Sequence, residues 1–193
     1  MKLLIIIILA HCANTLTAQN YRTVNNASSV KFIIQNFGMA TGGRFSGLQG
    51  DINFNPKDLK GSSFTMSIDA NTINTDIDVR DSALRTTAYL DAKMFPRINF
   101  NSKQITIADK ADMFFVKGII TIKEISKEIS FPFKLINKEE GILLSGDFKI
   151  SRRDFKIGNG SLVLSDTIII SLSVFAKKNY RIRYLILEDK LNG

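Results

Sequence analysis

Apolar and polar residues alternate with a period of two along most of the chain, which is the signature of β-strands that bury one face. The alternation recurs in eight separate runs and predicts eight strands. Their apolar positions are Val30, Phe32 and Ile34; Ile52 and Phe54; Phe64, Met66, Ile68 and Ala70; Ile98, Phe100, Ile105 and Ile107; Val116, Ile120 and Ile122; Ile129, Phe131, Phe133 and Leu135; Ile142, Leu144, Phe148 and Ile150; and Ile168, Ile170, Leu172, Val174 and Ala176.

Most links between these runs are short and rich in turn formers, as at Asn55-Pro56-Lys57-Asp58. Short links favour antiparallel pairing of neighbouring strands. Eight such strands can close into a barrel, which is just wide enough to hold side chains or one small ligand. The alternative is a two-sheet sandwich that fills its interior with its own residues.

One segment, residues 75–96, breaks the alternation and predicts a helix between the third and the fourth strand. Thr75 and Asp78 have the spacing of a capping box, and Pro96 ends the segment. Two apolar faces follow, formed by Val79, Ala83 and Leu90 and by Ile77, Leu84 and Tyr89. A helix with apolar faces must cover an apolar surface, and the open end of a barrel supplies one. The pattern does not distinguish a plug from a lid.

The first residues are typical of a secretory signal peptide, with Lys2 followed by an apolar run from Leu3 to Leu9 that is too short to span a bilayer. We place the cut after Ala18, so that the protein is periplasmic or secreted. In a minority alternative the protein is a lipoprotein anchored at Cys12. Cleavage after Ala18 removes His11 and Cys12, the only histidine and the only cysteine. The mature chain then lacks imidazole and thiol groups for catalysis, metal ligation or disulfides.

The chain carries a formal net charge of +8. Such an excess favours anionic partners, and a transient contact with a membrane surface is one expectation. Nucleic acid is the other partner that a basic β-protein suggests, but export argues against it. The main basic clusters are Arg152, Arg153 and Lys156 and the tail from Lys177 to Arg183, and each is also consistent with an ordinary solvated face.

Several motifs together resemble a known family. They are Gly43-x-Phe45-x-x-Leu48-x-Gly50-x-Ile52-x-Phe54, Thr75, Arg80-Asp81, Leu84, Tyr89-Leu90-Asp91, Phe95-Pro96-x-Ile98-x-Phe100-x-Ser102, Val116-x-Gly118-x-Ile120-x-Ile122 and the run from Ser151 to Gly158. In this order and spacing the chain resembles the YceI-like family over residues 21–178. The resemblance implies an exported, lipocalin-like antiparallel barrel whose apolar tunnel holds a polyisoprenoid or similar lipid. It implies a binding or transport protein rather than an enzyme.

The resemblance and the pattern together predict three regions: a signal peptide at 1–18, an all-β barrel domain at 19–178 and a C-terminal extension at 179–193. Lys156 is a departure, because relatives often have glycine there. Expected ligands are a polyisoprenoid, an isoprenoid quinone or a fatty-acyl lipid, and no cofactor or metal is expected. The predicted lining is Phe32, Ile34, Phe45, Met66, Ile68, Phe100, Ile120, Phe131, Phe133 and Phe148. Arg80 and Arg153 are the candidates for an anionic headgroup at the mouth.

Two other functions stay open. One is an exported structural or protein-interaction domain without a ligand, which a tightly packed interior would support. The other is a hydrolase that uses paired carboxylates, for which Asp76, Asp78, Asp81 and Asp91 are candidates. That alternative is weaker, because acids early in a helix also favour its dipole and no nucleophile, base and orienting group come together. The sequence names neither the ligand nor the oligomeric state.

Overall fold

The computed structural model describes residues 19–179, in which ten strands and one short α-helix follow one another. The strands are β1 (Gln19–Thr23), β2 (Ser29–Asn36), β3 (Met39–Phe45), β4 (Gln49–Phe54), β5 (Ser63–Asp69), β6 (Arg97–Ile107), β7 (Met113–Ile122), β8 (Ile125–Lys138), β9 (Gly141–Ser151) and β10 (Leu164–Lys178). The helix α1 (Asp78–Leu84) and the 3-10 helices η1 (Asn25–Ala27), η2 (Ala70–Thr72) and η3 (Arg152–Phe155) lie in the connections. The predicted signal peptide and residues 180–193 of the extension lie outside the described residues.

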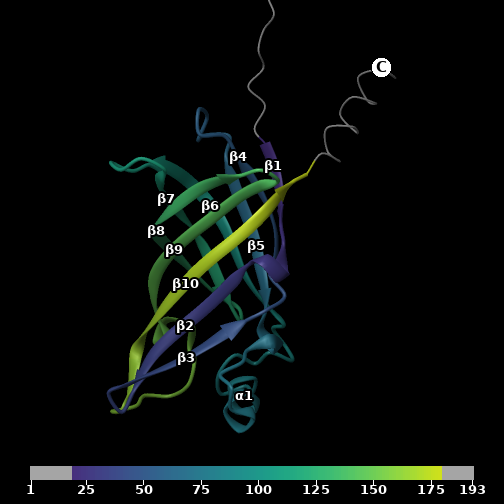
Figure 1. The fold of residues 1–193 in the computed structure, drawn as a ribbon. Coiled ribbons are helices and arrows are strands. Elements are labelled where there is room, and N and C mark those ends of the chain that lie inside the picture. Colours follow the sequence, from purple (N-terminus) through teal and green to yellow (C-terminus); the bar gives the residue numbers. More distant parts are fainter. Residues whose placement is uncertain (1–18, 180–193) are drawn as a thin grey trace, which may run out of the picture.

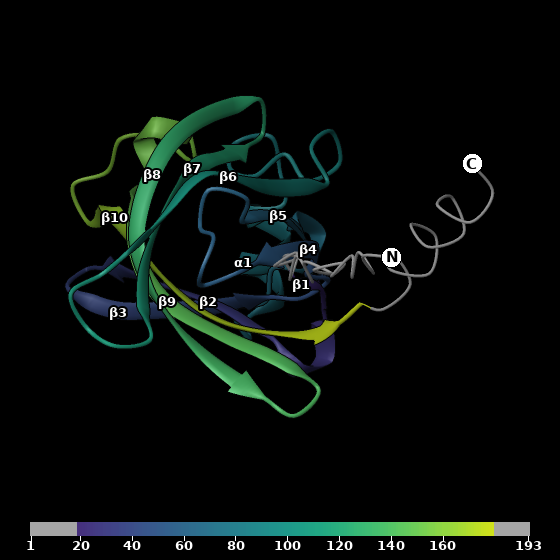
Figure 2. The same ribbon diagram turned by 90° about the horizontal axis from the view of Figure 1, so that it is seen from above.

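Eight strands close into an antiparallel barrel. The ring runs from β1 through β4, β5, β6, β7, β8, β9 and β10, and pairing of β10 with β1 closes it. Viewed from above, the strands encircle a common interior (Figure 2). The predicted eight-stranded barrel is therefore confirmed, and the sandwich is not what forms.

The membership of the ring differs from the prediction. β2 pairs with β10 between Leu164 and Ser173, β1 pairs with its last residues from Ala176 to Lys178, and β3 extends the sheet beyond β2. Alternation did not mark β1 or β3, because β1 has only five residues and β3 carries the pair Gly42-Gly43. A bridge between Arg44 and Asn74 joins β3 to the segment before α1. β2, β3 and the segment after η2 thus form one connected part of the barrel wall.

The helix differs from its prediction in place and length. It lies after β5 rather than between a third and a fourth strand, because β1 and β3 add two strands before it. It ends at Leu84, and the chain continues through irregular turns in which Asp91 adopts a left-handed φ of 47°. Figure 1 shows α1 at the end of the barrel opposite to the start of β1 and the end of β10.

The predicted capping box is also wrong. The N-cap residue of α1 is Ile77, whose side chain forms no capping hydrogen bond. Thr75 is buried instead, and its backbone N–H and hydroxyl both donate to the buried carboxylate of Asp81. Val79 is 82% exposed, so the predicted two-sided burial of the helix does not occur.

Candidate functional site

Inward-pointing side chains of neighbouring strands meet in rows because the strands are in register. Phe32 of β2 lies opposite Ile170 of β10, which lies opposite Phe148 of β9. Across the barrel, Phe100 of β6 lies between Met66 of β5 and Ile120 of β7. Since every second residue faces inward, the alternation of the sequence becomes a continuous apolar wall.

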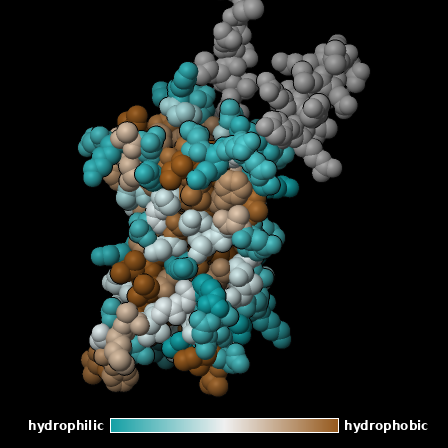
Figure 3. All heavy atoms as spheres, viewed as in Figure 1, coloured by the Kyte–Doolittle hydropathy of each residue, from teal (hydrophilic) through white to brown (hydrophobic). Residues whose placement is uncertain are grey.

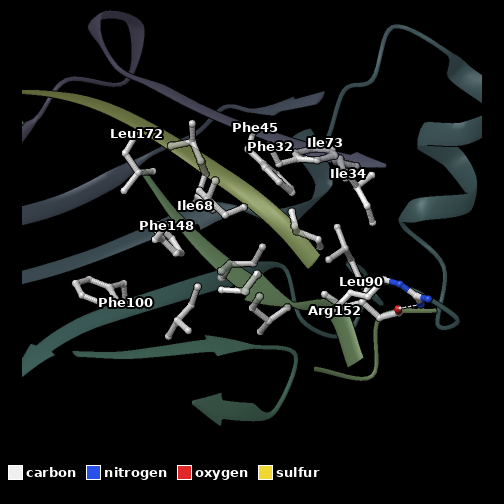
Figure 4. A pocket seen from close by; sticks show the side chains of 18 of the residues that line it. Phe32, Ile34, Phe45, Ile68, Ile73, Leu90, Phe100, Phe148, Arg152 and Leu172 are labelled. Atoms are coloured by element: carbon white, nitrogen blue, oxygen red, sulfur yellow. Dashed lines mark hydrogen bonds between the residues drawn. The ribbon is translucent and has the colours of Figure 1, made fainter. Parts of the chain in front are cut away.

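The rows enclose a cavity of about 460 Å³ with a nearly all-apolar lining. All ten predicted apolar lining residues contribute to the wall: Phe32, Ile34, Phe45, Met66, Ile68, Phe100, Ile120, Phe131, Phe133 and Phe148. In Figure 4, several of these side chains, with Leu172, surround the hollow. Their contact with a ligand stays a prediction. The volume falls within the range typical of small-molecule sites.

Glycines leave room for two of the lining rings. A Cβ at Gly43 would lie 2.4 Å from the Phe32 ring, and a Cβ at Gly118 would lie 2.6 Å from the Phe100 ring. Each ring therefore approaches the backbone of a neighbouring strand where a side chain is missing. Both glycines belong to the motifs that carried the family resemblance, and their role is to leave space.

An aromatic cluster closes one end of the cavity. Phe64 and Phe133 belong to the lining, and their rings lie 5.4 Å apart. Behind them Phe54 and Phe114 are buried, with ring centroids 6.4 and 5.5 Å from that of Phe133. Neither Phe54 nor Phe114 lines the cavity, so the barrel near β1 and β4 is filled with its own side chains. The hollow occupies the part of the barrel nearer α1.

The opposite end of the cavity reaches solvent. Ala83 of α1 and Ser161 and Val163 of the β9–β10 connection are both exposed and part of the lining, so they mark the mouth. Leu84, Tyr89 and Leu90 contribute to the wall from the segment around α1. That segment therefore covers part of the barrel end and leaves an opening beside it.

Two charged side chains line the cavity, and both are arginines. Arg80 is half-buried at the α1 side, where its Nε donates to the Thr75 hydroxyl at 2.8 Å and its Nη2 donates to the Thr75 carbonyl at 2.8 Å. Arg152 is the residue that sequence reasoning missed; in Figure 4 it lies at the same end as Leu90. Arg152 belongs to the run from Ser151 to Gly158, but alternation does not extend into a 3-10 turn.

Arg152 and its predicted neighbour Arg153 have different places. Arg152 is 1% exposed, and its guanidinium donates to backbone carbonyls of the β9–β10 connection, among them Ile157 at 3.1 Å and Asn159 at 2.6 Å. It also forms a salt bridge with Asp166 at 2.8 Å. Arg153 is exposed and is not part of the lining, so of the two arginines predicted at the mouth only Arg80 lies at the cavity wall. Its contact with a headgroup stays a prediction.

The four acids considered for hydrolysis do not come together in the cavity. None of Asp76, Asp78, Asp81 and Asp91 lines it. Asp81 is bound by Thr75, and Asp76 is bound through both oxygens by Arg44 at 2.7 and 2.9 Å. These Arg44 hydrogen bonds lower the pKa of the Asp76 carboxyl. Within residues 19–179, no three potential metal-ligating side chains form a cluster, and no helix is long and apolar enough to cross a membrane.

Comparison with known proteins identifies the family. The model of the YceI-like domain matches residues 21–176. The chain belongs to the YceI-like family. Protein YceI of Salmonella arizonae is 25% identical over 154 residues, which are 75% of this chain and 78% of that protein.

Solved structures show the same fold. The crystal structure of Burkholderia cenocepacia BcnA superposes with a TM-score of 0.75 at 21% identity, over 79% of this chain and 98% of that one. A polyisoprenoid-binding domain from Saccharophagus degradans, implicated in plant cell wall breakdown, superposes with a TM-score of 0.67 at 16% identity. The match covers 82% of this chain and 98% of that domain. Campylobacter jejuni YceI superposes with a TM-score of 0.65 at 25% identity, over 72% of this chain and 85% of that one.

Proposed function

We propose that this YceI-like protein is an exported carrier or store for a polyisoprenoid or a similar long apolar chain, which occupies the barrel cavity. The observation that carries the proposal is the continuous apolar hollow, which the protein's own side chains leave unfilled. The structure named as a polyisoprenoid-binding domain supports it by sharing the fold. The apolar run at Leu3–Leu9 supports export.

The physical basis of binding is removal of hydrocarbon from water. Each methylene that enters the cavity contributes about 0.8 kcal/mol. Apolar walls need no directional contact with a chain, whereas the polar end of the ligand needs a partner at the mouth. Arg80 can supply that partner, because its Nη1 is not among the nitrogens bonded to Thr75. An isoprenoid quinone and a fatty acid satisfy the same requirements. We propose a binding role rather than a catalytic one.

Filling the hollow tests the proposal. Met66→Trp adds bulk to the cavity wall, whereas Thr65→Trp adds the same side chain to the exposed face of the same strand. We expect native mass spectrometry and organic extraction to find a co-purifying lipid in the wild type and in Thr65→Trp. Uptake of a fluorescent fatty acid should fall at least about tenfold in Met66→Trp, because a tenfold change needs only about 1.4 kcal/mol.

Each variant contains a single tryptophan, since the natural chain has none, so near-ultraviolet circular dichroism checks that both are folded. Equal uptake by the two folded variants would contradict binding in the cavity. A wild type with no extractable lipid and no uptake of fatty acid or polyprenol would refute the carrier function and favour a structural domain.

A further inference from the structure

Exposed apolar side chains gather at the mouth of the cavity. Phe37 lies in the β2–β3 turn and is 70% exposed, Met39 begins β3 and is 69% exposed, and Leu162 and Val163 lie in the β9–β10 connection. The backbone N–H of Phe37 donates to the carbonyl of Val163 at 2.8 Å, so the two loops form one surface. We call these four residues the rim patch. Figure 3 shows hydrophobic surface at this tip of the molecule, where Figure 1 places the ends of β2, β3 and β10.

The distribution around the barrel is uneven. Of the eleven large hydrophobic side chains exposed in the described part of the chain, four form the rim patch and two more lie at the start of α1, Ile77 as its N-cap residue and Val79 in its first turn. Single exposed apolar residues are ordinary, but a group around an opening marks an interaction site. The mouth is therefore bordered by apolar side chains on two sides.

The backbone gives a second, independent indication. Phe37 has a φ of 51° and precedes Gly38, whose φ is 72°. A two-residue hairpin turn with both φ values positive favours asparagine followed by glycine, and a bulky aromatic residue there is an outlier. Phe37 is thus both strained and exposed, although neither property helps the hairpin to form. Strained residues of this kind cluster at functional positions.

Basic side chains lie along the β9–β10 connection, which also carries two residues of the rim patch. The guanidinium of Arg153 lies beside the connection that holds Leu162, 3.2 Å from where a Cβ on Gly160 would be. Lys156 is exposed, with a left-handed φ of 50°, and the ammonium of Lys123 donates to its carbonyl at 3.3 Å. None of these three cations forms a salt bridge with another residue of the described range.

Two of the nearby acids are engaged, because Asp166 is paired with Arg152 and Asp76 is paired with Arg44. Asp154 and Glu124, the chain neighbours of two of the cations, are exposed, as is Asp78 on α1. The border of the mouth therefore combines protruding apolar tips with exposed cations, on a chain whose formal net charge is +8.

We propose that the rim patch, with Arg153, Lys156 and Lys123, docks on the surface of an anionic phospholipid bilayer and brings the mouth against the membrane. Protruding apolar side chains flanked by cations match the acyl boundary and the headgroup phosphates of such a surface. This inference rests on the proposed function, because a bilayer is where a protein that binds long apolar chains would collect or deliver them.

Flotation with vesicles tests the docking surface. The probes are phosphatidylcholine vesicles with and without phosphatidylglycerol. We expect the wild type to float with the anionic vesicles, to float less with neutral ones and to dissociate as salt is added, because salt screens exposed charges. Phe37→Asn with Leu162→Ser should lower partitioning at least about tenfold, which corresponds to about 1.4 kcal/mol. Asparagine suits the turn, so this variant keeps the hairpin.

Two further variants complete the design. Ile107→Ser is the matched control, because Ile107 is 73% exposed at the far end of β6 and should not affect flotation. Arg153→Gln with Lys156→Gly should lower partitioning on anionic vesicles by about fivefold for each charge removed, and should change partitioning on neutral vesicles little. Glycine at 156 accepts the left-handed backbone.

The proposal is overturned if Phe37→Asn with Leu162→Ser floats as the wild type does. It is equally overturned if Ile107→Ser loses as much partitioning onto anionic vesicles as that double variant. A third contradicting result is a wild type that does not float with vesicles but forms dimers, where Phe37→Asn with Leu162→Ser stays monomeric. The rim patch would then join two copies of the chain. Fatty-acid uptake without vesicles separates the two proposals. The variants with changes in the rim patch or its cations should keep wild-type uptake of the fatty acid. Failure of the wild type to take up the fatty acid would count against the cavity function alone.

Discussion

Arg152 shows how one side chain can hold the border of a cavity that it also lines. Its guanidinium donates to carbonyls between Ile157 and Ser165, and it pairs with Asp166. The β9–β10 connection around it carries two residues of the rim patch, Leu162 and Val163. Arg152 therefore positions this connection rather than offering its charge to a ligand.

Removing Arg152 should destabilise the protein strongly. Arg152→Ala leaves several carbonyls of the connection without a donor, and we expect the free energy of unfolding in urea to fall by about 3–5 kcal/mol. Arg152→Lys should recover only part of this loss, because an ammonium lacks the planar fork. Arg153→Ala is the control, and a change within about 0.5 kcal/mol is expected at this exposed position. Similar losses at both positions would contradict the structural role of Arg152.

The pairing of Asp76 with Arg44 predicts a dependence of stability on pH. Hydrogen bonds from Arg44 lower the pKa of the Asp76 carboxyl in the folded state. Because the folded pKa is below the unfolded one, the stabilisation is present above the ordinary carboxyl pKa and is lost as pH falls through the lowered value. We expect Asp76→Asn to reduce the loss of stability in urea between about pH 6 and about pH 3. An acid limb in Asp76→Asn identical to that of the wild type would contradict the pairing.

At the scale of elements, the barrel has two parts: a packed core near β1 and β4, and a cavity nearer α1. The aromatic cluster of Phe54, Phe64, Phe114 and Phe133 separates the two parts. Under the proposed function, a chain that entered at the α1 end would meet Phe64 and Phe133 as its limit, and its polar end would stay near the mouth. The depth of the cluster would then set the length of chain that the barrel accepts.

Shortening Phe133 should lengthen the accepted chain. Phe133→Leu removes part of the ring that closes the cavity, and we expect the fatty acid or prenol of highest affinity to become longer by several carbons. Phe133→Ala should show a larger shift, together with a loss of about 3–5 kcal/mol in the free energy of unfolding. Affinities measured across a series of chain lengths check both. Phe115→Ala, on the exposed face of β7, is the control. An unchanged optimum in folded Phe133→Leu would contradict the limit.

For the whole molecule, much of the barrel was predictable, because a period of two marks both a strand and its inward face. The eight predicted runs correspond to β2 and β4–β10, and all ten predicted apolar lining residues line the cavity. Depth along the barrel was not predictable. Phe54 and Phe133 both belong to alternating runs, yet only Phe133 reaches the hollow, because strand tilt and register decide which level a residue occupies.

The remaining errors have local causes. β3 was missed because Gly42 and Gly43 interrupt the alternation. The helix was extended too far because apolar residues at helical spacing also fit irregular turns that pack on the barrel, as Tyr89 and Leu90 do. The prediction placed Arg153 rather than Arg152 at the cavity wall, because a 3-10 turn has no simple periodicity that separates the buried from the exposed residue.

The two ends of the described chain meet at the sealed side of the barrel. Gln19 lies opposite Phe54 of the aromatic cluster, and the backbone N–H of Asn179 donates to the carbonyl of Asn20 at 2.8 Å. A linker attached at Gln19 or at Asn179 therefore meets the barrel at the side away from the opening. Molecules immobilised on a sensor through these residues would all present their openings to the liquid, where the proposed hydrophobic guests would have access to them.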